Sequence, residues 1–236
     1  MQFRTQAVHH GVDKDLSYNS VTTPIYPTST FYYDRLGVNK GYDYTRSGNP
    51  TRSALEENLA ALEGAAACWC TSSGMSATAT VLHLLKPGEE VIAGMDVYGG
   101  TFRAMTRVFS KYGIRFSFVD LTDAENLRRA WTPQTRMVWI ETPSNPLLRL
   151  LDIAALSAIA RERGGLSVVD NTFMSPYFQR PLALGADIVY HSTTKYLNGH
   201  SDVIGGAILT ATRELGDEVY FLVNALGQGQ APMDSW

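Results

Sequence analysis

Short apolar runs alternate with amphipathic segments along most of the chain. The apolar runs are Val91–Ala93, Phe116–Val119, Met137–Ile140, Leu166–Val169, Ile188–Tyr190 and Ala207–Leu209. Helical spacing of apolar residues is found in the intervening segments Phe102–Tyr112, Glu125–Trp131 and Ile153–Glu162. This alternation predicts an α/β fold of three layers, in which helices cover both faces of a mostly parallel sheet. Ligands are then expected beyond the carboxyl ends of the strands.

The first fifty residues show neither short apolar runs nor the helical spacing of apolar residues. Turn formers such as Pro24 and Gly37 alternate there with aromatic residues such as Tyr32. Because such a segment cannot bury its aromatic side chains alone, we expect an extended arm that lies against its own domain or a second subunit. From Thr51 the spacing becomes helical, with Pro50 suited to the first turn and Gly64 placed to end the helix.

Composition narrows the class of protein. The chain has 236 residues, 44% of them apolar and 18% charged, and a net charge of −3. This composition is that of a chain that folds. Because the net charge is small, the electrostatic field of the protein is weak, which favours a small-molecule ligand over nucleic acid or an anionic membrane. Cys68 and Cys70 are too close in sequence to be a useful disulfide, which favours a reducing compartment. With no visible signal peptide or membrane span, we expect the cytoplasm.

Several common active-site motifs are absent. Gly227 and Gly229 approach a dinucleotide fingerprint but lack its third glycine, and no P-loop pattern occurs. Val203 replaces the second glycine of a nucleophile elbow. The five histidines are scattered, and Cys68 and Cys70 are more simply read as small buried residues, so no metal site is expected.

Polar segments follow four of the predicted strands, and two of them hold unusual charges. Asp170 comes directly after an apolar strand, where a carboxylate requires a cation or hydrogen-bond donors. Lys195 follows another strand and is placed to lose solvent and become a nucleophilic amine. Each alone is more often an ordinary strand end or a solvated lysine. Together with the helix start at Gly74, they fit pyridoxal phosphate (PLP), held as a Schiff base to Lys195 with Asp170 at its ring nitrogen.

The remaining parts of such a site are also present. Gly74 and Met75 would offer unpaired helix N-terminal N–H groups to the phosphate. Ser192 and Thr194 hydroxyls would add donors, and Tyr98 could stack on the pyridine ring.

One long segment carries a resemblance to a known family. Asp187–Ser201 resembles the cofactor-attachment signature of the transsulfuration family of PLP enzymes, which contains cystathionine γ-synthase, cystathionine γ- and β-lyases, methionine γ-lyase and the O-acylhomoserine sulfhydrylases. Supporting matches in the family's order are Tyr42–Arg52, Ser72–Met75, Asp96–Thr101, Trp139–Pro146 and Val169–Pro176. The resemblance covers essentially the whole chain.

The resemblance implies the large domain of PLP-dependent transferase fold type I. Residues 1–50 would be an N-terminal arm that reaches a neighbouring subunit, and residues 51–236 the PLP-binding α/β domain. The family's smaller C-terminal domain, whose arginine grips the substrate carboxylate, finds no counterpart here. Arg213, the last arginine, is better read as a solvated residue.

The resemblance also assigns roles to single residues. Lys195 and Tyr98 would be the catalytic residues, and Asp170 would pair with the pyridinium nitrogen. Asn145 would lie near the cofactor's 3′-oxygen and the substrate carboxylate. The phosphate would be held by Gly74, Met75, Ser192 and Thr194, and across a dimer by Tyr44 and Arg46. A homotetramer, as a dimer of dimers, is the implied assembly.

The implied activity is that of a C–S lyase in methionine and cysteine metabolism, acting on cystathionine or related sulfur amino acids by β- or γ-elimination. Phe173–Gly185 is most similar to the cystathionine γ-lyase branch. Cystathionine γ-synthase and O-acylhomoserine sulfhydrylase, which catalyse γ-replacement, remain alternatives because the same residues serve both directions. A PLP-binding fragment without turnover is the alternative of another class.

Overall fold

The computed structural model describes residues 1–12, 15 and 17–236. In this part of the chain the strands are β1 (Ala67–Thr71), β2 (Glu90–Gly94), β3 (Arg115–Val119), β4 (Thr135–Glu141), β5 (Leu166–Asp170), β6 (Ile188–His191) and β7 (Gly206–Thr210). They form one sheet in the order β1-β7-β6-β5-β4-β2-β3. β7 is antiparallel to both β1 and β6, and the other neighbours are parallel. The predicted, mostly parallel sheet is confirmed.

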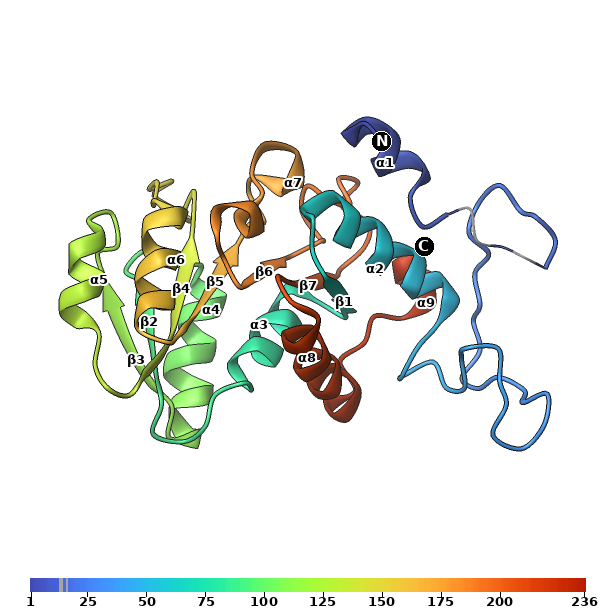
Figure 1. Ribbon diagram of the computed structural model, residues 1–236, viewed down its shortest axis with the longest axis horizontal. Coiled ribbons are helices and arrows are strands. Elements are labelled where there is room, and N and C mark those ends of the chain that lie inside the picture. Colours follow the sequence, from blue (N-terminus) through green and yellow to red (C-terminus); the bar gives the residue numbers. More distant parts are fainter. Residues whose placement is uncertain (13–14, 16) are drawn as a thin grey trace.

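Helices lie on both faces of this sheet (Figure 1). The helices of the described chain are α1 (Phe3–His9), α2 (Pro50–Glu63), α3 (Gly74–Leu82), α4 (Gly99–Arg103), α5 (Ala124–Ala130), α6 (Ile153–Glu162), α7 (Ser175–Phe178), α8 (Arg213–Leu226) and α9 (Pro232–Ser235). A π turn at Ala104–Val108 and a 3-10 turn at Phe109–Tyr112 continue α4, and a second 3-10 turn spans Pro181–Leu184.

Alternation along each strand divides the core between the two faces. Trp139 and Tyr190 pack on one face with residues of α3 and α8. Val169 packs on the other with α5 and α6, and Val189 on that same face with α2. Because side chains of a strand point alternately to the two faces, the three predicted layers follow from the apolar runs.

Local signals set the bounds of α2 as the sequence predicts. The Asn49 side chain caps the helix by accepting a hydrogen bond from the Thr51 N–H at 2.9 Å. Pro50 occupies the first position, and Gly64 ends the helix with a φ of 73°. This helix carries Glu63 to the carboxyl end of the sheet, which matters below.

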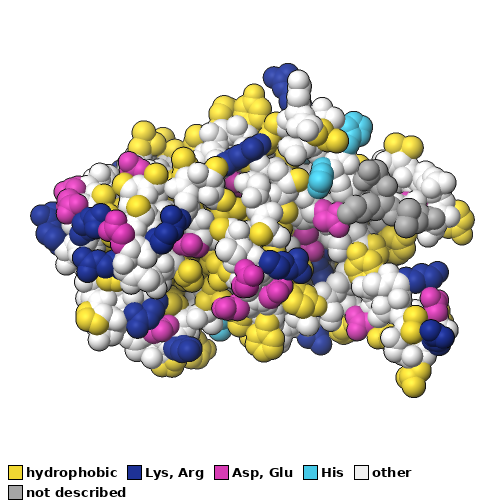
Figure 2. Space-filling view, viewed as in Figure 1, with side chains coloured by type: hydrophobic (Ala, Val, Ile, Leu, Met, Phe, Trp, Pro, Cys, Tyr) yellow, Lys and Arg dark blue, Asp and Glu magenta, His cyan; other side chains and the backbone are white. Residues whose placement is uncertain are grey.

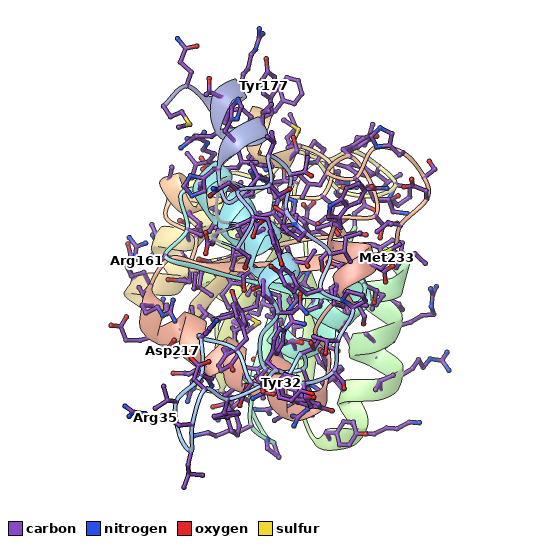
Figure 3. The ribbon with its side chains drawn as sticks, turned by 90° about the vertical axis from the view of Figure 1, so that its right-hand side faces the viewer. Tyr32, Arg35, Arg161, Tyr177, Asp217 and Met233 are labelled. Atoms are coloured by element: carbon purple, nitrogen blue, oxygen red, sulfur yellow. The ribbon has the colours of Figure 1, made fainter. Side chains whose placement is uncertain are left out.

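The first fifty residues form an arm, but not a wholly irregular one. The structure corrects the prediction at Phe3–His9, which form α1. This helix is supported from outside itself, since the Asn58 side chain of α2 donates to the carbonyl oxygens of Gln6 and His10 at 3.1 and 2.9 Å. Farther along, the arm projects from the body (Figure 2), and Figure 3 shows Tyr32 and Arg35 far from Tyr177 and α1. Tyr32 is fully exposed.

Two further sequence expectations concern β1 and the membrane. Cys68 and Cys70 are buried free thiols in β1, and burial raises the pKa of the Cys68 thiol well above its usual range. None of the helices in the described ranges has the length and apolar character needed to cross a bilayer.

Candidate active site

A cavity of about 290 Å³ lies where β4, β5 and β6 end and α3 begins. Eight of the predicted site residues line it, namely Gly74, Met75, Tyr98, Asn145, Asp170, Ser192, Thr194 and Lys195. They come from segments that are spread over more than a hundred residues, from Gly74 to Lys195. The parallel sheet brings the ends of the strands before these segments to one edge. The cavity has the size of a small-molecule site.

The N-terminus of α3 is built to receive an anion. Ser73 caps the helix by accepting from the Ser76 N–H at 3.0 Å, whereas the N–H groups of Gly74 and Met75 have no hydrogen-bond partner among the described residues. A Cβ at Gly74 would lie 2.7 Å from Cβ of Ser192. Glycine at this position therefore allows β6's continuation to approach the free N–H groups closely.

Two hydroxyl groups that line the cavity with this helix start differ in their hydrogen bonding. The Ser192 hydroxyl has no partner within the described part of the chain, and its own N–H donates to Oγ1 of Thr172 at 2.9 Å. The Thr194 hydroxyl is already engaged: it donates to the carbonyl oxygen of Gly205 at 3.2 Å and accepts from the Gly205 N–H at 3.0 Å. Ser192 is thus the readier donor, and Thr194 must rotate its O–H to reach an anion.

Asp170 lines the same cavity and is largely buried. Only 9% of it is exposed, and it has no cationic partner among the described residues. Its Oδ1 accepts from the Thr172 N–H at 3.0 Å and its Oδ2 from the Tyr190 hydroxyl at 2.6 Å. Burial and the neighbouring Asp170 raise the pKa of Tyr190 well above its usual range, which keeps this phenol a donor.

Glu141 is a site residue to which the sequence reasoning gave no role. It pairs in register with Asp170, which in turn pairs with Tyr190, so three adjacent strands end in a row of polar side chains on one face. Burial, together with the charge of Asp170, raises the pKa of Glu141 to about 8. A carboxyl group directly after the apolar run Met137–Ile140 is a signal that could have identified it, but its hydrogen-bond partners come from distant loops.

Those partners are the backbones of two predicted site residues. One oxygen of Glu141 accepts from the Tyr98 N–H at 2.8 Å and the other from the Asn145 N–H at 2.8 Å. The single carboxyl group therefore ties the loop after β2 to the loop after β4. In this way it fixes where the Tyr98 ring and the Asn145 amide stand at the mouth of the cavity.

Lys195 lines the cavity but departs from one expectation. The sequence predicts a lysine that has lost solvent, whereas the structure leaves Lys195 exposed, with no hydrogen bond or ion pair of its amine to any described residue. The reason is its position in the turn after β6, beyond the covered sheet; its N–H donates to the Ser192 carbonyl oxygen at 3.2 Å. The amine is free to react with a group placed in the cavity.

Tyr44 and Arg46, the two predicted arm residues, do not reach this cavity. Arg46 lies over the Tyr44 ring at 5.4 Å from its centroid and donates to the Asn224 carbonyl oxygen of α8 at 2.6 Å. Arg213 also lies elsewhere: it is exposed at the start of α8 and pairs with Asp217 at 3.0 Å. Its interpretation as a solvated residue is confirmed.

The fold and these side chains are typical of a PLP-binding protein. Residues 4–236 match the family described as "Cys/Met metabolism PLP-dependent enzyme". The chain therefore belongs to the Cys/Met metabolism family of PLP-dependent enzymes, as the resemblance of its motifs indicated.

Relatives with several names support this assignment. The chain is 50% identical to a probable cystathionine gamma-synthase of Herpetosiphon aurantiacus, over 99% of this chain and 73% of the relative. It is 49% identical to a cystathionine beta-lyase of Lactococcus lactis, over 99% of this chain and 61% of the relative. A crystal structure of cystathionine gamma-lyase from Lactobacillus plantarum, complexed with L-serine, superposes with a TM-score of 0.98 at 46% identity, over 100% of this chain and 62% of that one. The chain thus spans about three fifths of two of these three proteins.

The residues in the cavity fit PLP. The free N–H groups of Gly74 and Met75 and the Ser192 hydroxyl suit its phosphate. The buried Asp170, which lacks a cationic partner in the described chain, suits a protonated ring nitrogen. The unpaired amine of Lys195 suits the aldehyde carbon, and the Tyr98 ring lies beside the same cavity.

Proposed function

We propose that the chain is the cofactor-binding part of a PLP-dependent C–S lyase that acts on cystathionine or a related sulfur amino acid by β- or γ-elimination. One observation carries the proposal: Asp170 and Lys195 line the same cavity as the free N-terminus of α3. The three groups match the ring nitrogen, the aldehyde carbon and the phosphate of one molecule of PLP.

Binding and orientation of the cofactor fall to the sheet edge. The N–H groups of Gly74 and Met75 and the hydroxyl of Ser192 hold the phosphate, and Thr194 adds a donor once its O–H turns from Gly205. Tyr98, held at its N–H by Glu141, places its ring against the pyridine. The phosphate and the ring are thus fixed by two separate loops.

Two residues handle the protons. PLP, when bound, supplies an electron sink for the bond broken at the substrate's Cα. The carboxylate of Asp170 would keep a proton on the ring nitrogen. The Tyr190 hydroxyl and the Thr172 N–H hold that carboxylate in place. Lys195 would be the base that removes the proton from Cα of the substrate and gives a proton to the thiolate that leaves.

Cystathionine γ-synthase is the second candidate. It is favoured by the 50% identity to a probable cystathionine gamma-synthase, and the residues that take a proton from Cα in elimination serve γ-replacement equally. A cofactor-binding part without turnover of its own is the third, favoured by the cavity lining: it contains no arginine for a substrate carboxylate in the described chain.

The assembly we propose is a homo-oligomer in which the arm serves a neighbouring subunit. Tyr44 and Arg46 lie outside the cavity of their own chain, and Tyr32 and Leu36 are fully exposed on the same arm. An arm with this much exposed apolar surface is suited to an interface. We also propose that the protein acts in the cytoplasm, in the methionine and cysteine metabolism of the cell.

The test begins with cofactor attachment. We expect the purified protein to bind PLP with a visible absorption band, and borohydride reduction followed by peptide mapping to find the pyridoxyl group on Lys195. Lys195→Ala should abolish this attachment, with Lys111→Ala, an exposed lysine on the turn before β3, as the matched control. Absence of attachment to Lys195 in the wild type would refute the cofactor site.

Substrate then separates the three candidates. Release of an oxoacid and a thiol from cystathionine supports the lyase. Formation of cystathionine from cysteine and an activated homoserine ester, without that release, supports the synthase. Attachment of PLP without any change of its absorption by these amino acids supports a cofactor-binding part without turnover.

A further inference from the structure

A second buried polar cluster lies behind the strand ends that carry the cofactor site. It consists of Glu63, Asn171, Gln179 and His191, and we call it the rear cluster. Glu63 and His191 are almost fully buried, and Asn171 is completely buried. No member of the rear cluster lines the cavity. These residues are therefore not explained by contact with cofactor or substrate.

Hydrogen bonds join the end of α2 to the ends of three strands through this cluster. Oε1 of Glu63, at the end of α2, lies 2.7 Å from Nε2 of His191 and accepts from the Asn171 amide at 2.8 Å. The Gln179 amide donates to Oδ1 of Asn171 at 2.9 Å and to the carbonyl oxygen of Thr142 at 3.0 Å. The rear cluster thus spans the carboxyl ends of β6, β5 and β4.

Each member on a strand end is the chain neighbour of a site residue. Asn171 follows Asp170, and His191 lies between Tyr190 and Ser192. Because consecutive side chains in extended backbone point to opposite faces, Asp170 and Tyr190 face the cavity while Asn171 and His191 face α2. A shift of His191 must therefore move Ser192, and a shift of Asn171 must move Asp170.

Glu63 and His191 have few polar partners besides each other and Asn171. Glu63 stands at the carboxyl end of α2, where the helix dipole disfavours a carboxylate, so it depends on the donors that meet it. Its Oε2 and the Nδ1 of His191 have no hydrogen-bond partner in the described chain. All the polar support of this buried carboxyl group therefore comes from the ends of β5 and β6, at a single oxygen.

We propose that the rear cluster is a positioning device: Glu63, through His191 and Asn171, sets the spacing between Asp170 at the ring-nitrogen end of the PLP site and Ser192 at its phosphate end. The proposal rests on the proposed cofactor site. A PLP molecule is rigid between its ring nitrogen and its phosphate attachment, so the two ends of the site must be held at a matching separation. Besides the rear cluster, the backbone ladder, the Tyr190 to Asp170 hydrogen bond and the bond from the Ser192 N–H to Oγ1 of Thr172 join the two strand ends. The rear cluster is the link on the face opposite the cavity.

The test separates positioning from stability by replacing the pair. We expect His191→Phe and Glu63→Leu, made singly in the full chain, each to lower the urea midpoint and to weaken PLP binding about tenfold. The double variant removes both polar partners, and an apolar pair in place of a buried polar pair often restores stability. We therefore expect its urea midpoint to recover while PLP binding stays about tenfold weaker and the circular dichroism of the bound cofactor stays altered.

Two matched variants complete the experiment. His191→Gln keeps an N–H donor for Glu63 and should restore PLP affinity to within about threefold of the wild type. Glu90→Gln changes another buried carboxylate, held by Ser117, Thr132 and Thr135 at the opposite ends of the strands, and should leave PLP affinity unchanged.

The outcomes are distinct. Recovery of PLP affinity together with the urea midpoint in the double variant would overturn the positioning role, as would single variants that bind PLP like the wild type. An equal loss of affinity in Glu90→Gln would overturn it too, since the effect would then be one of general stability. A wild-type protein that binds no PLP would overturn both this inference and the proposed function.

Discussion

The hydroxyl of Tyr190 donates a hydrogen bond to Oδ2 of Asp170 at 2.6 Å from the adjacent strand, and both residues line the cofactor cavity. Tyr190 is 2% exposed, and its ring lies 5.1 Å from that of Trp139. The bond holds in place the carboxylate that we propose to pair with the ring nitrogen of PLP. Tyr190 thus acts on the cofactor site through Asp170.

Removal of the Tyr190 hydroxyl should lower the free energy of unfolding and the affinity for PLP. Tyr190→Phe keeps the ring against Trp139 but leaves Asp170 with one donor fewer, and we expect a loss of about 1–3 kcal/mol in the free energy of unfolding. PLP affinity should also fall, and the bound cofactor's absorption should shift with the protonation of its ring nitrogen. Urea titration and visible spectroscopy check the two effects. An unchanged cofactor spectrum would show that Asp170 needs no help from Tyr190.

Gly74→Ala should impair phosphate binding. The added Cβ would stand 2.7 Å from Cβ and 3.0 Å from Cα of Ser192, so the start of α3 must shift away from β6. Because the free N–H groups shift with it, we expect PLP to bind about tenfold or more weakly, measured by fluorescence titration. Gly94→Ala is the matched control, since its Cβ would meet only ordinary contacts at 3.8 Å or more. Equal loss in both variants would contradict a specific role of Gly74.

The layers of the fold follow from the sequence because each apolar run alternates between two buried faces. Asp170 and Lys195 could be found for a related reason: a charge directly after a buried strand is unusual enough to indicate chemistry. Glu141 meets the same criterion, since it directly follows the apolar run Met137–Ile140, but neither its role nor the rear cluster could be found this way. Their partners, Tyr98 and Asn145 in one case and Glu63 with His191 in the other, are brought together only by strand register and by where α2 ends.

Exposure of a side chain is equally hard to predict from spacing. The amine of Lys195 stays in solvent because the chain turns away from the sheet between Thr193 and Asn198. Likewise α1 depends on hydrogen bonds from Asn58, more than fifty positions away from Gln6, so local periodicity carries no sign of it. Both errors come from tertiary contacts that override or replace the local pattern.

The pH dependence of stability should reveal Glu141. Burial, with the charge of Asp170, raises its pKa from 4.5 to about 8, so the folded protein holds a proton that the unfolded chain releases above pH 4.5. The free energy of unfolding should therefore decrease as pH rises from about 4.5 to about 8 and then level off. Glu56 adds to the same slope, since burial raises its pKa from 4.5 to about 7.

Glu141→Gln should reduce this slope, because the residue that carries the proton is gone. Urea titrations between pH 5 and pH 8 measure it. Glu90→Gln is the control. Burial alone would raise the pKa of Glu90, but hydrogen bonds from three hydroxyls lower it overall. Its effect on the pH dependence of stability is therefore confined to pH values below about 4.5, outside the measured range. A slope that is the same in Glu141→Gln and the wild type would contradict a protonated Glu141.

The arm should act on the site of a neighbouring subunit. Arg46→Ala should weaken PLP binding although Arg46 lies outside the cavity of its own chain. Asn224→Ala is the control for the side-chain contacts of the arm, because it removes the Oδ1 atom that Arg46 and Ser47 contact within the chain. Loss of PLP affinity in Arg46→Ala but not in Asn224→Ala would show that these side-chain contacts do not account for the loss.

Mixed oligomers then show whether Arg46 serves the cofactor site of its own chain or that of its neighbour. When Arg46→Ala and Lys195→Ala subunits are unfolded together and refolded, a dimer with one of each has one site with both residues intact, provided that Arg46 serves its neighbour. Random pairing makes this about one quarter of all sites. We expect that fraction to retain PLP bound to Lys195 after gel filtration and borohydride reduction, with wild-type affinity. If Arg46 served its own chain, no site would combine the two residues, and the mixture would match the average of the two variants refolded separately.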